Sequence, residues 1–267
     1  MQALSLIQSA QNSMVKHAYS LKVPKKAKDS LDFLCEGFHL AQEALKSGLR
    51  CRFIFATKDG WNHPDGKIIY EMAHREKVKC FEITSKIVSY LADTVTPQGL
   101  LAVVAKPEPS WPADSFSLIL AVHRVQDAGN MGTLFRSAEA FGAQALFLTD
   151  GCCDPFNPKA VRASMGSLFR TPFMLGQTSE NYMEWFKRNH FHTTALTLEN
   201  SEPMTKLHFP RPAAIWVGSE GAGLPEELIQ LCDQKVHIPM LGKVESLNVG
   251  VAASLALFWA QFQGPVS

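Results

Sequence analysis

The chain has 267 residues, of which 46% are hydrophobic and 19% are charged, and its formal net charge is +1. This composition describes a soluble globular protein with a sizeable core rather than a disordered chain, and the length suits two domains. The charge is unevenly distributed: residues 1–110 hold 15 Lys and Arg against 11 Asp and Glu, whereas residues 111–267 hold 11 against 14. A basic amino-terminal half suggests a polyanionic partner.

The cysteines and the apolar runs bear on location and on metal binding. None of the six cysteines forms a CxxC pair with another, which indicates reduced thiols and no metal site. Residues 1–16 lack the long apolar core of a signal peptide. The longest nearly apolar run, residues 251–260, is far shorter than the roughly 20 residues that span a bilayer. We therefore expect a cytoplasmic protein without a membrane partner.

The first part of the chain has the pattern of a small α/β domain, which we expect over residues 1–107. A short strand should lead into a helix over 32–48. A strand, a helix and two further strands should follow over 51–57, 66–77, 78–84 and 99–105.

A lysine-rich loop and a proline-rich stretch flank this pattern. The loop KVPKKAKDS contains Lys25, Lys26 and Lys28, and such a cluster is either a solvated loop or a contact for nucleic-acid phosphates. The stretch KPEPSWPADS, residues 106–115, has three prolines in ten residues and little periodicity. We therefore expect a linker at 108–114.

Apolar strands alternate with helices over the remaining residues, 115–267. The predicted strands are 117–122, 144–149, 171–175, 192–198, 213–217 and 235–240. The predicted helices are 133–141, 158–169, 179–189, 225–231 and 248–262. This alternation predicts a mostly parallel sheet with helices on both faces. Ligands of such sheets bind beyond the carboxyl ends of the strands, where three unusual loops of this part lie.

The first two loops carry polar residues among glycines. DAGNMGTLFR, residues 127–136, has two glycines that permit a sharp turn, and Arg136 points away from the apolar side of the following helix. Asp127 or Asn130 could simply shape the turn, and Arg136 could be an ordinary surface charge. VGSEGAGLPEEL, residues 217–228, places Glu220 between glycines, where a carboxylate is difficult to explain as structure.

The third loop leads into the last predicted helix. IPMLGKVESLNVGVAASLALF, residues 238–258, contains Ser246 and Asn248, either of which could cap the helix. The helix over 248–262 is nearly apolar all round, so it is either buried or part of a subunit interface.

Together and in this order, the three motifs resemble those of the SpoU (TrmH) family, the RNA 2′-O-ribose methyltransferases of the SPOUT superfamily. They occur here as DAGNMGTLFRSAEAFGA, GSEGAGL and IPMLGKVESLNVGVAASLALF, and FNPKAVRASMGSLFRTPF is similar to the segment between the first two family motifs. FLCEGFHLAQEALKSG is similar to the start of an RNA-recognition domain that many members carry. Two positions depart from the family, because Ala128 stands where Pro is usual and Gly250 where Ser is frequent.

The resemblance implies the fold and the reaction. The fold would be α/β, with a trefoil-knotted, mostly parallel sheet and a smaller amino-terminal α/β RNA-binding domain. The enzyme would transfer a methyl group from S-adenosylmethionine to a ribose 2′-hydroxyl of RNA, preferably ribosomal RNA because of the added domain. It would form a homodimer and need no metal.

The resemblance also implies the site. The catalytic residues would be Arg136, Asn130, Glu220 and Asn248. The cofactor pocket would be formed by Gly218, Ile238, Leu247, Met240, Ser246 and Thr197. Independently of the resemblance, the basic amino-terminal half and its lysine cluster lead us to expect that Lys25, Lys26 and Lys28 contact the substrate, and we expect Arg162 to do so as well.

Three alternatives stay open at this point. The target could be transfer RNA, the protein could bind RNA on the same fold without catalysis, or it could be another nucleotide-binding α/β enzyme. The intact Arg136, Glu220 and Asn248 argue against the second alternative. The lack of both GxGxxG and the P-loop motif argues against the third.

Overall fold

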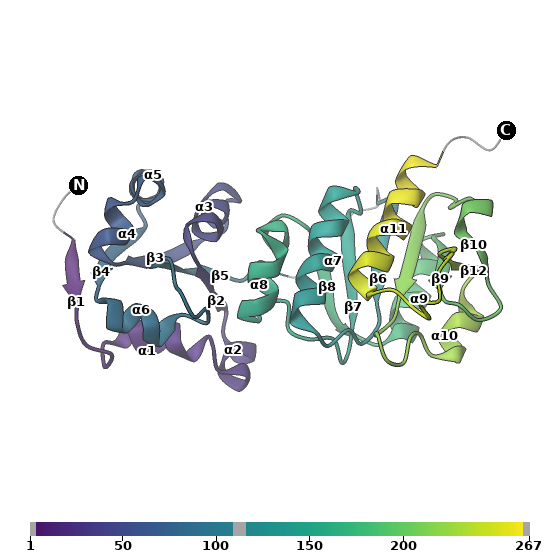
Figure 1. Cartoon of the computed structure of the whole chain (residues 1–267), viewed down its shortest axis with the longest axis horizontal. Coiled ribbons are helices and arrows are strands. Elements are labelled where there is room, and N and C mark those ends of the chain that lie inside the picture. Colours follow the sequence, from purple (N-terminus) through teal and green to yellow (C-terminus); the bar gives the residue numbers. More distant parts are fainter. Residues whose placement is uncertain (1–3, 109–115, 264–267) are drawn as a thin grey trace. The chain divides into compact units, whose positions relative to one another are not determined.

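The structure, a computed structural model, describes residues 4–108 and 116–263. The expected linker at 108–114 lies outside the described residues except for Glu108. The chain divides into two compact units, which are described separately (Figure 1). Unit 1 comprises residues 1–108 together with 154–169, and unit 2 comprises 109–153 and 170–267. The segment 154–169 thus groups with unit 1, although it lies within the range 115–267 that we expect for the second domain.

Unit 1 is built on a mixed five-stranded sheet in the order β1-β4-β3-β5-β2. The strands are β1 (Ser5–Ile7), β2 (Asp32–Glu36), β3 (Cys51–Ala56), β4 (Lys79–Ile83) and β5 (Leu100–Ala105). β1, β4 and β3 run parallel, and β5 lies antiparallel between β3 and β2. The α/β character expected for this part of the chain is confirmed, and β1 is an edge strand that the sequence pattern did not predict.

The helices of unit 1 start where the sequence offers capping side chains. The helices before residue 108 are α1 (Ser13–Ser20), α2 (Pro24–Asp29), α3 (Phe38–Lys46), α4 (Lys58–Asn62), α5 (Pro64–Arg75) and α6 (Ser85–Leu91). Four of them begin after a side chain that accepts a hydrogen bond from the first turn, namely Asn12, Thr57, His63 and Thr84.

Residues 154–169 belong to unit 1 because of aromatic packing. The segment contains α8 (Pro158–Ser164) and a short 3₁₀ turn, Ser167–Phe169. The rings of Phe156 and Phe169 lie 5.1 and 5.6 Å from that of Phe33 on β2. The single helix predicted over 158–169 is interrupted, since Met165 adopts a left-handed backbone conformation with φ of 51°.

Unit 2 contains a seven-stranded sheet in the order β10-β12-β9-β11-β6-β7-β8, and all its described strand pairs are parallel. The strands are β6 (Leu118–Val122), β7 (Ala145–Thr149), β8 (Phe173–Gln177), β9 (His192–Leu196), β10 (Glu202–Pro203), β11 (Ala213–Val217) and β12 (Gln234–His237). Every residue of β6, β7 and β11 is buried, which explains their unbroken apolar or small-residue sequence. The predicted mostly parallel sheet is confirmed, and the trefoil knot stays a prediction.

Helices cover both faces of this sheet. They are α7 (Ala128–Ala140), α9 (Ser179–Arg188), α10 (Glu226–Leu231) and α11 (Val249–Phe262). α9 and α10 pack on one face, through Tyr182 and Leu228 among others, while α7 and α11 lie side by side on the other (Figure 1). The hydroxyls of Ser137 and Ser254 join α7 to α11 at 2.6 Å. A Cβ atom at Gly250 would lie 2.8 Å from Thr133 Cγ2, so glycine here permits close helix packing.

Within the described residues, no helix combines the length and the apolar character that crossing a membrane requires. All six cysteines are free thiols, and burial raises the pKa of Cys51 to about 12 and that of Cys80 to about 11. These two thiols are therefore protonated and unreactive at neutral pH.

Candidate active site

Three polar side chains, one from each motif, meet at the carboxyl end of the unit 2 sheet. Asn130 lies in the first turn of α7, Glu220 in the loop after β11, and Asn248 at the start of α11. The amide nitrogen of Asn248 donates to Glu220 Oε1 at 2.7 Å and to Asn130 Oδ1 at 2.9 Å. The amide nitrogen of Asn130 donates to the same Glu220 oxygen. One carboxylate oxygen therefore fixes the orientation of both amides.

Helix capping accounts for the local geometry of this cluster. Asp127 Oδ1 accepts a hydrogen bond from the Asn130 backbone N–H at 2.9 Å, so α7 begins at Ala128. The sharp glycine turn expected at 127–136 was wrong, because Gly129 and Gly132 are helical. Asn248 Oδ1 accepts from the backbone N–H of Gly250 at 3.0 Å. Asn248 thus caps α11 with its oxygen and binds Glu220 with its nitrogen, so the two roles considered for it coexist.

Arg136 is a solvent-exposed cation on α7. Its neighbours Leu134 and Ala138 are fully buried, as the helical pattern predicts. Within 4–108 and 116–263, the guanidinium of Arg136 makes no hydrogen bond or ion pair, whereas Arg170 and Arg188 pair with carboxylates. The fold therefore leaves this group available for an external anion.

A pocket of about 630 Å³ adjoins the polar cluster. It lies beyond the carboxyl ends of β9, β11 and β12, where a parallel sheet places its ligands. Its lining includes all six residues predicted to hold the cofactor, namely Thr197, Gly218, Ile238, Met240, Ser246 and Leu247. Glu220 also lines the pocket and so joins it to the cluster with Asn130 and Asn248.

Gly218 is required by the loop itself. A Cβ atom there would lie 2.1 Å from the carbonyl carbon of Gly223 and 2.2 Å from its oxygen. Gly223 has a left-handed backbone with φ of 64°, and its N–H donates to the Ser219 carbonyl at 2.8 Å. The glycines thus form a tight turn whose backbone faces the pocket.

Comparison with known proteins places the chain in a family. Residues 117–258 match the model of the SpoU rRNA Methylase family, and residues 12–102 match the MRM3-like substrate binding domain. The chain belongs to the SpoU rRNA methylase family. Membership confirms the expected fold class and the expected enzyme, an S-adenosylmethionine-dependent RNA 2′-O-methyltransferase.

Individual relatives support this assignment. The 23S rRNA (guanosine(2553)-2′-O)-methyltransferase RlmP of Bacillus subtilis is 32% identical, over 94% of this chain and 97% of its own. The 23S rRNA (uridine(2479)-2′-O)-methyltransferase of Streptomyces viridochromogenes is also 32% identical, over 61% of this chain and 60% of its own. An AdoMet-bound rRNA methyltransferase from Sinorhizobium meliloti superposes with a TM-score of 0.84 at 27% identity, and the match covers 96% of this chain and 97% of that one.

The pocket residues suit the family cofactor. Ile238 and Leu247 offer apolar walls for a purine, and the turn at Gly218 offers backbone hydrogen-bonding groups. Glu199 and Glu226 also line the pocket, and their carboxylates complement the positive charge of a sulfonium and an amino group. Sequence analysis missed Glu199 and His237. Glu199 directly follows the predicted strand 192–198, and His237 lies within the predicted strand 235–240, so only Glu199 was marked by a position just after a strand.

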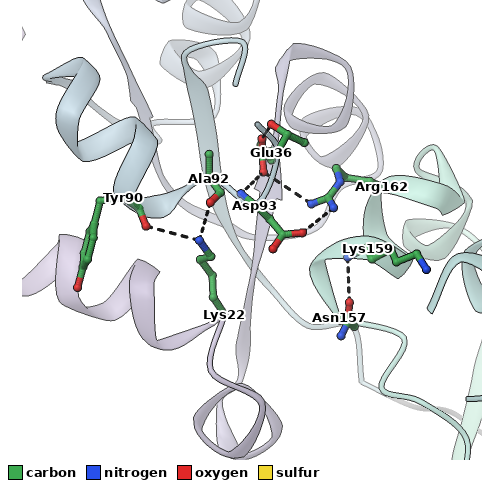
Figure 2. Close-up of polar contacts among 9 residues, drawn as sticks. Lys22, Glu36, Tyr90, Ala92, Asp93, Asn157, Lys159 and Arg162 are labelled. Atoms are coloured by element: carbon green, nitrogen blue, oxygen red, sulfur yellow. Dashed lines mark hydrogen bonds and ion pairs between the residues drawn. The ribbon is translucent and has the colours of Figure 1, made fainter. Parts of the chain in front are cut away.

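The residues predicted to bind substrate lie in unit 1, in two different settings. Lys25, Lys26 and Lys28 are exposed on α2, so the prediction that they lie in a loop was wrong, because Pro24 starts a short helix there. Arg162 on α8 is instead held by carboxylates, with Nη2 2.6 Å from Asp93 Oδ2 and Nη1 3.7 Å from Glu36 Oε2 (Figure 2). Those carboxylates compete with any RNA phosphate for this guanidinium.

Proposed function

We propose that this methyltransferase modifies ribosomal RNA and that Arg136, Asn130, Glu220 and Asn248 form its catalytic centre. The observation that carries the proposal is the hydrogen-bonded cluster of Asn130, Glu220 and Asn248 at the edge of the pocket. A protein that only bound RNA would have no need for a polar cluster built beside a small-molecule pocket.

The pocket would hold S-adenosylmethionine through Gly218, Ile238 and Leu247, together with Thr197, Met240 and Ser246. When bound, the cofactor supplies an electrophilic methyl group on a positively charged sulfur. The protein's task is then to hold a ribose 2′-hydroxyl in line with that group, and positioning of this kind supplies much of the acceleration in such reactions. Both N–H groups of the Asn248 amide are engaged within the cluster, so the groups left to bind the ribose are the second N–H of Asn130 and the other carboxylate oxygen of Glu220.

Arg136 would bind the phosphate next to the target ribose. A guanidinium stays protonated in proteins, so it cannot act as the general base. The planar guanidinium can instead donate hydrogen bonds to two phosphate oxygens and polarise the neighbouring hydroxyl. The proton of the 2′-hydroxyl then leaves to the phosphate or to water.

The homodimer remains a proposal, and two features of unit 2 support it. Along α11, Val251, Leu255, Phe258 and Phe262 are exposed, and their spacing places them on one side of the helix. Arg136 lies six residues after Asn130, which in an α-helix is about 9 Å along the axis and about 120° around it. The two side chains therefore diverge within one chain. A second copy packed on α11 would bury the apolar stripe and bring Arg136 of the partner subunit to this cluster.

Recognition of ribosomal RNA would rest on unit 1, where Lys25, Lys26 and Lys28 are exposed. The matched relatives named above act on different 23S rRNA nucleotides, one a guanosine and one a uridine. We also propose a cytoplasmic location, in keeping with six free thiols.

The decisive experiment maps 2′-O-methylated positions in total RNA from cells with and without the gene. Loss of one ribosomal-RNA methylation, restored by the wild-type gene but not by Arg136→Ala, is the expected result. A change confined to transfer RNA would show that transfer RNA, and not ribosomal RNA, is the substrate. Unchanged methylation in all RNA would reject the proposal.

A further inference from the structure

A second pocket lies at the carboxyl edge of the sheet in unit 1. Its volume is about 430 Å³, and it is formed where β3 and β4 end and β5 begins. Part of its wall consists of two backbone segments in close contact, at Gly60 and Gly99. A Cβ atom added at Gly60 would lie 2.6 Å from the Gly99 carbonyl oxygen, so a side chain there would not fit. This edge of unit 1 has no part in the proposed chemistry of unit 2.

A stacked aromatic pair forms one side of this pocket. The rings of Phe38 and His63 are 4.5 Å apart with planes inclined by 16°. Phe38 is buried, whereas the side chain of His63 is 48% exposed. The backbone N–H of Asp65 donates to His63 Nδ1 at 3.2 Å, which holds the ring in place. The imidazole ring of His63 is therefore held in place by Phe38 and Asp65 and is still accessible for stacking by a ligand. We call it the platform.

Polar side chains with unused hydrogen-bonding capacity surround the platform. Gln98 accepts a hydrogen bond from the Phe38 backbone N–H through Oε1 at 3.2 Å, which leaves its amide nitrogen as a donor. Ser85 and Ser89, one turn apart on α6, and the carboxylate of Asp59 also line the pocket. In the described part of the chain, the Asp59 carboxylate makes no hydrogen bond or ion pair.

The rim of the pocket is held by the network that contains Arg162. The Glu36 carboxylate accepts a hydrogen bond from the backbone N–H of Asp93 at 2.8 Å, and Arg162 donates one to the Asp93 carboxylate at 2.6 Å (Figure 2). Asp93 begins the loop that leads to Pro97 and Gln98 on the rim. Arg162 is thus a positioning residue for this loop, which accounts for an arginine that is largely shielded from solvent.

We infer that this pocket binds one unpaired nucleobase of the RNA substrate, stacked on His63. The inference rests on the proposed function, since it takes RNA as the ligand. Sequence-specific RNA recognition uses unpaired bases stacked on aromatic rings and hydrogen-bonded along their edges, and the pocket supplies both kinds of contact. Lys58 and Lys86 are exposed next to the lining residues Asp59 and Ser85, where they can bind the flanking phosphates. An exocyclic amino group of adenine, cytosine or guanine would donate to the Asp59 carboxylate, whereas uracil offers only its ring N3–H, so the first three bases should be preferred.

Two substitutions of His63 separate the platform from its structural role as the cap of α5. His63→Asn keeps a good capping side chain and removes the ring, whereas His63→Phe keeps the ring and removes the cap. Stacking on one base is worth about 1–3 kcal/mol, so His63→Asn should weaken RNA binding roughly 5- to 150-fold. His63→Phe should bind RNA nearly as wild type although its melting temperature falls.

The assay measures binding of full-length protein to single-stranded A, C, G and U homopolymers, and in parallel to S-adenosylmethionine. Wild type should bind the U homopolymer most weakly, and Asp59→Asn should narrow that difference. Cofactor affinity should be unchanged in every variant. Equal RNA affinity of His63→Asn and wild type, or a loss in His63→Phe as large as in His63→Asn, would overturn the inference. Because these are binding measurements, they stand apart from the methylation map, whose failure would reject the proposed function instead.

Discussion

Replacement of Arg136 gives the sharpest test of the catalytic centre. The side chain is exposed and makes no contact with a carboxylate in the described residues, so Arg136→Ala should change the free energy of unfolding by no more than about 0.5 kcal/mol. A bidentate grip on phosphate comprises two charge-assisted hydrogen bonds, each worth about 1.5–3 kcal/mol. Their loss predicts a fall in the methyl-transfer rate of roughly 10²- to 10⁴-fold.

Arg136→Lys separates the charge from the geometry. Lysine keeps a positive charge but lacks the planar fork, so about one of the two hydrogen bonds is lost and the rate should fall roughly 10- to 150-fold. Single-turnover transfer to transcribed ribosomal RNA, with saturating S-adenosylmethionine, measures the step. Arg188→Ala is the matched control, because Arg188 is another exposed helical arginine of unit 2 and its i,i+4 pair with Glu184 is worth little.

The outcomes of these variants are distinguishable. A near-normal rate for Arg136→Lys would refute bidentate positioning and leave a general electrostatic role. A near-normal rate for Arg136→Ala would remove Arg136 from the catalytic centre. A low rate accompanied by weakened cofactor binding would place the defect in the pocket of unit 2 and contradict the assignment to RNA phosphate.

Three further predictions concern the cluster, the interface and the pocket. Asn248→Ser keeps a capping oxygen but loses the amide that binds Glu220, so the melting temperature should be retained while the methyl-transfer rate falls. If the melting temperature and the rate fell together, Asn248 would only cap α11. Phe258 is 47% exposed and Leu257 is fully buried, so Phe258→Glu should give folded monomers by light scattering, whereas Leu257→Glu should unfold the protein. If the site is shared between subunits, inactive Arg136→Ala and Asn248→Ser chains should regain activity when refolded together, and no recovery would argue for a site within one chain. Gly218→Val should abolish S-adenosylmethionine binding in calorimetry and lower the melting temperature, because the valine Cβ would collide with Gly223. Unchanged cofactor binding would contradict the assignment of this pocket to the cofactor.

Local patterns in the sequence were sufficient for six of the seven strands in the unit 2 sheet, all but β10, whereas the candidate site residues came from the resemblance of three motifs to a known family. Strands such as β6 and β11 are buried on both faces, so five consecutive apolar residues identify them without tertiary information. The three motifs follow strands, and parallel strands present their carboxyl ends at one edge, which is why Asn130, Glu220 and Asn248 could be expected to meet.

Tertiary structure decided what depends on contacts between distant residues. Arg162 looked like a free cation for RNA, but its partner Asp93 lies 69 residues earlier in the chain. The segment 154–169 joins unit 1 because Phe156 and Phe169 meet Phe33, and an apolar pattern does not specify which apolar surface it will cover. Gly250 weakens a helix in isolation. In the folded protein, however, Thr133 of α7 packs so close to it that a Cβ atom at this position would collide with the threonine side chain. Sequence patterns report local periodicity, whereas partner choice is set by non-directional burial and by side chains brought together only when the chain has folded.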